Sequence, residues 1–282
     1  MIRPLFYEGK EKCLTFSYDD GVTQDRRLVE LFNKYGIRGT FNLDSGCFGK
    51  FAKANGNFIK ETTHNKIEES EVAELYQGHE VAVHTISHPN LVYLNEDAIR
   101  YEVMEDRKNL ERLVGYPVTG MAYPFGTYDD TVISVLKECG IHYSRTTVAT
   151  KTLGVPRDFM TWHPSCHFGD DTMEMLITRF LKDKTEQSHY NYQKLLYIWG
   201  HSYELDGHET WALMEETLQR LSGQPDVWYA TNIEIFFYEQ ALQNLEYSAD
   251  QRMIKNTSAM SVWLSIDGKT VEIKAGETYV AG

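Results

Sequence analysis

Two short stretches of this sequence carry side chains that could together bind a metal ion and activate a water molecule. Asp19 and Asp20 are adjacent, and His84 and His88 are separated by three residues. Two histidines and one carboxylate can hold a catalytic metal and leave one coordination position open. The second carboxylate could then act as a general base. These residues predict a metal-dependent hydrolase.

The spacing of the two histidines indicates a loop rather than a helix. His84 ends a run of strand-forming residues, and Pro89 disfavours helical geometry at His88. Residue 85 is threonine, so the helical zinc motif His-Glu-x-x-His is not formed here. Proteins with parallel sheets build their sites at the carboxyl ends of the strands. A histidine pair in that place favours metal binding over simple packing.

The elements that must position these residues alternate between strands and helices, which is typical of a parallel sheet, either a barrel or an open α/β sheet. Runs of β-forming residues predict strands at 13–18, 39–43, 80–84, 119–123, 142–146, 195–199 and 227–231. Apolar periodicity predicts helices at 24–35, 67–77, 96–114, 129–138, 172–181, 210–222 and 232–245. Residues 44–60 are expected to form a loop or hairpin, either over the site or as an ordinary surface feature.

The pattern changes after residue 247. Alternating β patterns at 261–266 and 270–274 flank the turn at residues 267–269, and a third short run ends at Val280. We therefore predict a catalytic domain over residues 1–247 and a small C-terminal β-hairpin extension over residues 248–282.

Composition restricts the class of protein. The 282 residues are 42% hydrophobic and carry a formal net charge of −13, and the isoelectric point is near 5.2. Such a chain argues against nucleic acid or an anionic membrane as partner and favours an uncharged substrate. The first residues hold no apolar run typical of a signal peptide, and the four cysteines form no Cys-x-x-Cys pair. We expect reduced thiols and a cytoplasmic location; the sequence does not predict an oligomeric state.

Four stretches resemble, in order, the motifs of polysaccharide deacetylases with a NodB homology domain, which form carbohydrate esterase family 4. The resemblance covers residues 13–245 and implies a distorted (β/α)7-8 barrel of parallel strands with the small β extension appended. The four stretches are Thr15-Phe16-Ser17-Tyr18-Asp19-Asp20-Gly21, His84-Thr85-Ile86-Ser87-His88, Ala122-Tyr123-Pro124-Phe125-Gly126 and Trp199-Gly200-His201.

The resemblance gives the acidic residues and the histidine pair separate roles. Asp20, His84 and His88 would hold a divalent metal, with zinc as the first choice and cobalt, nickel or manganese as alternatives. Asp19 would take a proton from a metal-activated water. That water would attack the acetyl carbonyl of an N-acetylated or O-acetylated sugar or oligosaccharide.

The resemblance also assigns the groups that complete the reaction. The backbone N–H of Phe125 would help to hold the oxyanion, and His201 would protonate the leaving amine or alkoxide. Aromatic rings near the motifs could stack on a sugar, although most aromatic residues of a protein lie in its core. The side chains that could line the cleft are Tyr123, Tyr128, Trp162, Trp199, Tyr203, His163 and His167.

The sequence departs from the family pattern at three places. Ala122 stands where the family carries an arginine that contacts the catalytic aspartate, and Trp199 stands in place of a leucine near the acetyl pocket. The family's Asp-Trp motif is matched only loosely by Asp158 and Trp162. Because Arg145 lies at the end of the next predicted strand, its guanidinium could replace the missing arginine beside the base.

Two other function classes stay open at this point. One is a hydrolase of non-sugar C–N bonds, such as a cyclic amide or ureide, on the same scaffold. The other is a catalytically silent carbohydrate-binding protein. The presence of all three metal-binding residues counts against the first, and the presence of Asp19 and His201 counts against the second.

Overall fold

A central sheet of parallel strands organises the protein, of which this computed structural model describes residues 1–182 and 193–281. Its strands are β2 (Lys12–Asp19), β3 (Gly39–Leu43), β4 (Glu80–Val83), β5 (Gly120–Ala122), β6 (Tyr143–Arg145), β7 (Cys166–His167), β8 (Lys194–Gly200) and β9 (Val227–Tyr229). They run in the order β6-β5-β4-β3-β2-β8-β7, with β9 also paired to β2. The seven predicted strands are therefore confirmed, whereas β7 is an addition.

The two edges of this sheet are brought together by the chain between β6 and β8. The Trp162 N–H donates to the Ser144 carbonyl, and the Thr146 N–H donates to the Trp162 carbonyl, both at 3.0 Å. Shortly afterwards β7 pairs with β8. The sheet therefore curls into the distorted barrel that the sequence predicts.

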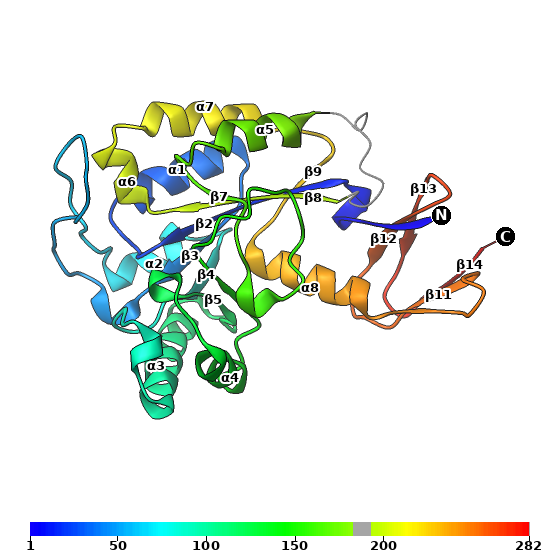
Figure 1. Cartoon of the computed structure of the whole chain (residues 1–282), viewed down its shortest axis with the longest axis horizontal. Coiled ribbons are helices and arrows are strands. Elements are labelled where there is room, and N and C mark those ends of the chain that lie inside the picture. Colours follow the sequence, from blue (N-terminus) through cyan, green and yellow to red (C-terminus); the bar gives the residue numbers. More distant parts are fainter. Residues whose placement is uncertain (183–192, 282) are drawn as a thin grey trace.

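Helices cover the outside of the barrel. In Figure 1, α1, α5 and α7 lie along one side of the strands, and α3 and α4 lie on the opposite side. The helices are α1 (Asp25–Tyr35), α2 (Val72–Leu75), α3 (Glu96–Val114), α4 (Asp130–Glu138), α5 (Met173–Leu181), α6 (Ser202–Gly207), α7 (Trp211–Leu221) and α8 (Asn232–Gln243).

The ends of α3 fall where the sequence predicts them. The Asn95 side chain accepts the Ala98 N–H at 2.9 Å, and Gly115 ends the helix with a left-handed φ of 77°. The predicted helix at 67–77 is shorter in the structure. There Glu68 and Glu71 form a capping box around a 3₁₀ turn, and α2 begins only at Val72.

The amino-terminal end of α8 is bonded to side chains inside the barrel. The Asn232 side chain accepts from the Thr15 hydroxyl at 2.9 Å, and the Ile233 N–H donates to Glu80 at 2.9 Å. Glu80 also accepts from the Thr40 hydroxyl at 2.8 Å and from the Tyr143 hydroxyl at 2.7 Å. A buried polar network therefore connects this helix to four strands of the barrel.

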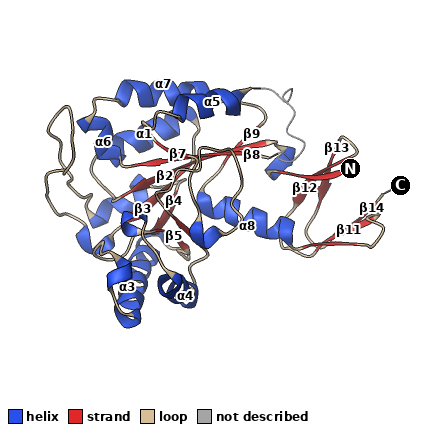
Figure 2. Cartoon of the chain, viewed as in Figure 1, coloured by secondary structure: helices blue, strands red, loops and turns tan. Residues whose placement is uncertain are grey.

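Two small antiparallel sheets lie beyond α8, at the end of the molecule where both chain termini are found (Figures 1 and 2). One consists of β1 (Ile2–Leu5), β12 (Val262–Ile266) and β13 (Lys269–Ile273), and the other of β10 (Leu245–Tyr247), β11 (Met253–Asn256) and β14 (Thr278–Val280). The predicted hairpin is β12–β13, with Asp267 and Gly268 in left-handed geometry at its turn. The pairing of β1 with β12 was not predicted. The division of the chain at residue 247 stays a prediction.

The four cysteines are free thiols, three buried and one half-buried. None of the described helices combines the length and the apolar character that a membrane span requires.

Candidate active site

The carboxyl ends of β2 and β4 bring the three predicted metal-binding residues together. One ligand atom from each of Asp20, His84 and His88 lies within 4.8 Å of the other two. The Asp20 Oδ1 atom is 3.9 Å from His84 Nε2 and 3.8 Å from His88 Nε2. Nitrogen and oxygen atoms in this arrangement could hold a divalent metal ion.

The ring of His84 is fixed by the neighbouring strand. Its Nδ1 lies 2.8 Å from the Ala122 carbonyl oxygen, which can only accept, so Nδ1 carries the proton. The unprotonated Nε2 therefore faces Asp20. Burial lowers the pKa of His84 to about 4, and the ring is neutral, as a metal ligand must be.

Left-handed backbone geometry is concentrated in the loops of this site. Among non-glycine residues, φ is 81° at Asp20, 68° at Thr85, 57° at His88 and 59° at Phe125. The Thr85 hydroxyl accepts the His88 N–H at 3.0 Å and so stabilises the loop between the two histidines. Residues other than glycine rarely adopt this backbone geometry, and those that do are often found at active sites.

The predicted base, Asp19, is buried beside Asp20. The Arg145 guanidinium contacts both Asp19 carboxylate oxygens, and Asn42 Nδ2 donates to Asp19 Oδ1 at 2.8 Å. Arg145 is fully buried, and its guanidinium carbon lies 4.4 Å from the centre of the Trp199 ring. Burial acts to raise the pKa of Asp19, but the positive charge of Arg145 outweighs it and lowers that pKa. The contact predicted for Arg145 is present, while its effect on a reaction stays a prediction.

The predicted acid, His201, lies across the site from the metal-binding histidines. Its Nε2 is 3.9 Å from one oxygen of Asp19 and 3.9 Å from one oxygen of Asp20. Its Nδ1 lies 3.2 Å from Glu204, whose other oxygen is 2.9 Å from His167 Nε2. Burial acts to lower the pKa of His201, but the Glu204 hydrogen bond and the Asp20 charge raise it to about 9. His201 is therefore protonated at neutral pH.

Glu204 was missed at the sequence level. The acidic residue considered there, Asp158, instead accepts the Met160 N–H at 2.9 Å and caps its own turn. A signal for Glu204 was available, because it stands three residues after His201 at the start of a short helix, in capping-box spacing.

A hairpin brings two further residues that the sequence analysis missed. His64 Nε2 lies 2.9 Å from Asp20 Oδ2. Lys66 Nζ donates to the Asp20 carbonyl oxygen at 2.6 Å and lies 2.8 Å from an oxygen of the Asp44 carboxylate. Both residues follow the segment 44–60, and no motif or periodicity marks them.

Two of the predicted sugar-stacking residues belong to the core instead, which corrects that prediction. Trp162 and Tyr123 are each 1% exposed. The Trp162 ring packs edge-on against Tyr143 and Tyr197, and the Tyr123 hydroxyl donates to the Met160 carbonyl at 2.8 Å. Neither ring has a face available for a sugar.

The other candidate cleft residues are divided between the site and its surroundings. Trp199 is 8% exposed and packs against Arg145 and His201, so its ring helps to position these two side chains. Phe125 is 60% exposed and meets His88 edge-on at 4.7 Å. The remaining contacts are Tyr128 stacked on Tyr123, Tyr203 against His64 and His201, and His163 Nδ1 at 2.5 Å from the Thr146 hydroxyl.

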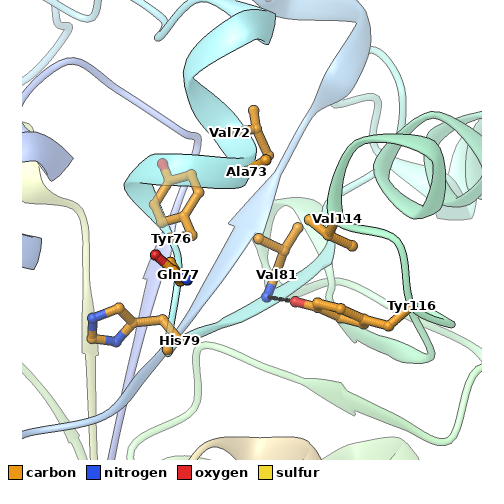
Figure 3. A pocket seen from close by; sticks show the side chains of 9 residues that line it. Val72, Ala73, Tyr76, Gln77, His79, Val81, Val114 and Tyr116 are labelled. Atoms are coloured by element: carbon orange, nitrogen blue, oxygen red, sulfur yellow. Dashed lines mark hydrogen bonds between the residues drawn. The ribbon is translucent and has the colours of Figure 1, made fainter.

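A recess of about 260 Å³ lies at the opposite end of β4 from His84. Figure 3 shows the side chains that line it, among them Tyr76, His79 and Val114. The Val81 N–H donates to the Tyr116 hydroxyl there at 3.1 Å. This recess contains none of the predicted site residues.

Comparison with known sequences agrees with the resemblance. The sequence model of the polysaccharide deacetylase family matches residues 7–144. The peptidoglycan-N-acetylglucosamine deacetylase of Bacillus cereus is 27% identical over 120 residues, which are 43% of this chain and 38% of that protein. The chitin deacetylase of Arthroderma benhamiae is 28% identical over 143 residues, which are 49% and 34% of the two chains. The matches thus span little more than a third of these relatives' length.

Solved structures share the fold. A protein from Mycobacterium smegmatis described as a polysaccharide deacetylase has a TM-score of 0.58 at 15% identity, covering 86% of this chain and 94% of its own. The chitin deacetylase of Colletotrichum lindemuthianum has a TM-score of 0.51 at 17% identity, with coverages of 83% and 89%. The family model matches the segment that holds Asp19, Asp20 and the histidine pair, and these solved structures have the same fold as the chain.

Proposed function

We propose that this protein is a metal-dependent hydrolase that removes acetyl groups from N-acetylated or O-acetylated carbohydrate. The observation that carries the proposal is the position of Asp19 and His201, the proposed base and acid, around one set of possible metal ligands. Asp20, His84 and His88 are grouped within 4.8 Å, while Asp19 and His201 approach the same place from β2 and β8. The names of the deacetylase relatives agree with this chemistry.

The residues present fit a divalent cation, because two histidine nitrogens and an ionised carboxylate converge. We propose zinc first, with cobalt, nickel or manganese as alternatives. When bound, the cation would polarise the acetyl carbonyl and make a water acidic enough to lose a proton near neutral pH.

Asp19 would accept that proton. Arg145 contacts both of its oxygens, keeps the carboxylate ionised and fixes its orientation. The backbone N–H of Phe125, at the rim of the site, is the proposed donor to the oxyanion.

His201 would donate a proton to the leaving nitrogen or oxygen. It is protonated at neutral pH because Glu204 holds its Nδ1, and its Nε2 is directed toward the two aspartates. The lowered pKa of Asp19 suits a base and the raised pKa of His201 suits an acid, so both groups can be in the required protonation state at one pH.

Acetate release tests this function. N-acetylglucosamine oligomers and acetylated xylan should be compared as substrates, with the protein as purified, after chelation and after return of one metal equivalent. We expect release from at least one of them, loss on chelation and recovery with metal. A metal-loaded protein that releases no acetate but binds the sugars would favour a silent binding protein. Hydrolysis of a cyclic amide or ureide alone would favour the non-sugar hydrolase.

A further inference from the structure

We propose that His64 is a positioning residue for the metal-binding carboxylate, and that the hairpin over residues 48–66 is therefore part of the metal site. We call this segment the site hairpin. The inference rests on the proposed metal site and deepens it. It concerns a residue outside the motifs that carry the family resemblance.

The two oxygens of Asp20 face different partners. Oδ1 faces the imidazoles of His84 and His88, at 3.9 and 3.8 Å, and Lys66 Nζ lies 3.6 Å from it on the hairpin side. Oδ2 lies 2.9 Å from His64 Nε2. An ionised carboxylate can only accept, so Nε2 of His64 carries the proton and donates it. His64 thereby holds the outer oxygen and leaves the inner one directed at the histidine pair.

A second imidazole also lies near the outer oxygen of Asp20. His201 Nε2 lies 3.9 Å from the same Oδ2. A carboxylate that turned toward His201 would move Oδ1 away from the histidine pair. The hydrogen bond from His64 therefore selects one orientation of Asp20.

Backbone hydrogen bonds fix the register of the site hairpin. The His64 N–H donates to the Ala52 carbonyl at 2.8 Å, and the Lys66 N–H donates to the Lys50 carbonyl at 2.9 Å. Lys66 Nζ then ties the end of the hairpin to the Asp20 main chain at 2.6 Å. These bonds fix the position of the hairpin relative to Asp20, and so they fix the distance between the His64 imidazole and the Asp20 carboxylate.

The outer face of the site hairpin is packed against α6. The His64 ring meets the Tyr203 ring edge-on at 4.8 Å, and Phe58 meets Tyr203 at 6.1 Å. The Lys60 N–H donates to the Gly207 carbonyl at 3.0 Å. The imidazole is thus supported on both sides, and only 24% of its side chain is exposed.

Groups that hydrogen-bond to a metal ligand typically change metal affinity by about 10- to 100-fold when they are removed. We therefore expect His64→Ala to bind Zn²⁺ about 10- to 100-fold more weakly than the unsubstituted protein. His64→Gln should recover most of the affinity, because its amide nitrogen can occupy the place of Nε2. His208→Ala is the matched control, since His208 is exposed and packs on Phe58 of the same hairpin at 5.1 Å.

Metal affinity is measured by competition with a chromophoric chelator, and Co²⁺ absorption reports the ligand set. The expected result is one equivalent bound in every variant, with the cobalt spectrum of His64→Ala unchanged in intensity and the His208→Ala affinity unchanged. Equal affinity in His64→Ala and the unsubstituted protein would overturn the inference. So would a changed cobalt spectrum in His64→Gln, because it would make His64 a ligand.

A separate variant distinguishes this outcome from failure of the proposed function. His84→Ala should lose stoichiometric binding altogether, whereas His64→Ala should only weaken it. If the unsubstituted protein binds no divalent metal, the metal site and the positioning role fall together. If the unsubstituted protein binds one equivalent of metal and His64→Ala binds it with the same affinity, only the positioning role of His64 is refuted.

Discussion

Asp19 is an ionised carboxylate without access to bulk water, so its chemistry depends on the residues around it. It is 3% exposed, and Arg145 and Asn42 hold its oxygens. Asparagine has nearly the same shape but cannot take a proton at neutral pH. We expect Asp19→Asn to retain one equivalent of metal and to lose about 10²- to 10⁴-fold in kcat. Metal content and acetate release measured on one preparation check this, and activity near that of the unsubstituted protein would exclude Asp19 as the base.

Arg145 contacts both oxygens of the proposed base through one guanidinium nitrogen, Nη2, while its planar group packs on the Trp199 ring. Lysine keeps the positive charge but lacks the planar group that this packing holds in place. We expect Arg145→Lys to fold and to lose roughly tenfold or more in kcat/KM, because the carboxylate loses its fixed orientation. The exposed Arg157 offers the control substitution, Arg157→Lys. Unchanged kinetics in Arg145→Lys, with circular dichroism matching the unsubstituted protein, would contradict a role in orienting Asp19.

Glu204 is bonded to the proposed acid, because its carboxylate lies 3.2 Å from His201 Nδ1. Because that bond helps to raise the pKa of His201, its loss must lower the pKa. A general acid acts only while protonated, so the alkaline limb of the kcat/KM profile should move to lower pH in Glu204→Gln. The profile should be recorded from pH 5 to pH 10 for both proteins. An alkaline limb that stays in place would show that another group sets it.

At the scale of the element, Glu80 connects β4 to the start of α8. Burial raises the pKa of this carboxyl to about 7, from an ordinary 4.5, although three donors oppose the shift. Between pH 4.5 and about pH 7, Glu80 is therefore protonated in the folded protein to a greater extent than in the unfolded chain. The contribution of Glu80 to stability therefore falls as the pH rises from about 4.5 through about 7, and is constant above.

Glutamine at this position should remove that dependence. As the pH rises through this window, the free energy of unfolding of the unsubstituted protein should fall relative to that of Glu80→Gln. Urea titrations at a series of pH values measure the difference. Glu246→Gln, at an exposed position, is the control and should show no comparable trend. A pH-independent difference for Glu80→Gln would refute the assignment.

The sequence predicted the long and regular elements best. Helix α3 begins and ends as expected because Asn95 and Gly115 provide strong local signals. By contrast β7 has two residues and α6 has six, too few to show a period. Their formation depends on pairing with β8 and on packing beside the site, which are non-local effects.

The same contrast holds within the site. Asp19, Asp20 and the histidine pair stand in short motifs at strand ends, so their residue types and spacing point to them. His64 reaches Asp20 only because a hairpin folds back across the barrel, and no local pattern encodes that distance. Arg145 is predictable because Ala122 leaves no arginine in its own strand, and Arg145 ends the neighbouring strand, where it pairs in register with Ala122. The prediction that Trp162 lines the cleft was wrong because the residue type alone does not tell a buried ring from one that lines a cleft.

At the scale of the whole molecule, the small sheets share an apolar cluster with α8. Leu264, Val262 and Ile254 of those sheets pack in one cluster with Ile235 and Tyr238 of the helix. The Trp263 N–H also donates to the Tyr238 hydroxyl at 3.1 Å. This shared core predicts that the extension and the barrel unfold together.

Leu264 tests that coupling. It is 1% exposed, and its replacement by alanine should lower the free energy of unfolding by about 2–5 kcal/mol. The 61%-exposed Val280 provides the control, where alanine should change stability by about 0.5 kcal/mol or less. Far-ultraviolet circular dichroism and tryptophan fluorescence should report a single shared transition. Two separate transitions, with only one moved by Leu264→Ala, would mean that the extension folds independently.

The pairing of β1 with β12 has a consequence for the order of events during synthesis. Ile2 lies opposite Ile266, so a strand made before the barrel strands pairs with one made after them. While the barrel strands are being made, the hydrogen-bonding edges of β1 face solvent or chaperone. This strand can reach its place only after β12 has emerged. Completion of the small sheet therefore follows synthesis of the barrel and joins segments that lie on either side of the barrel in the sequence.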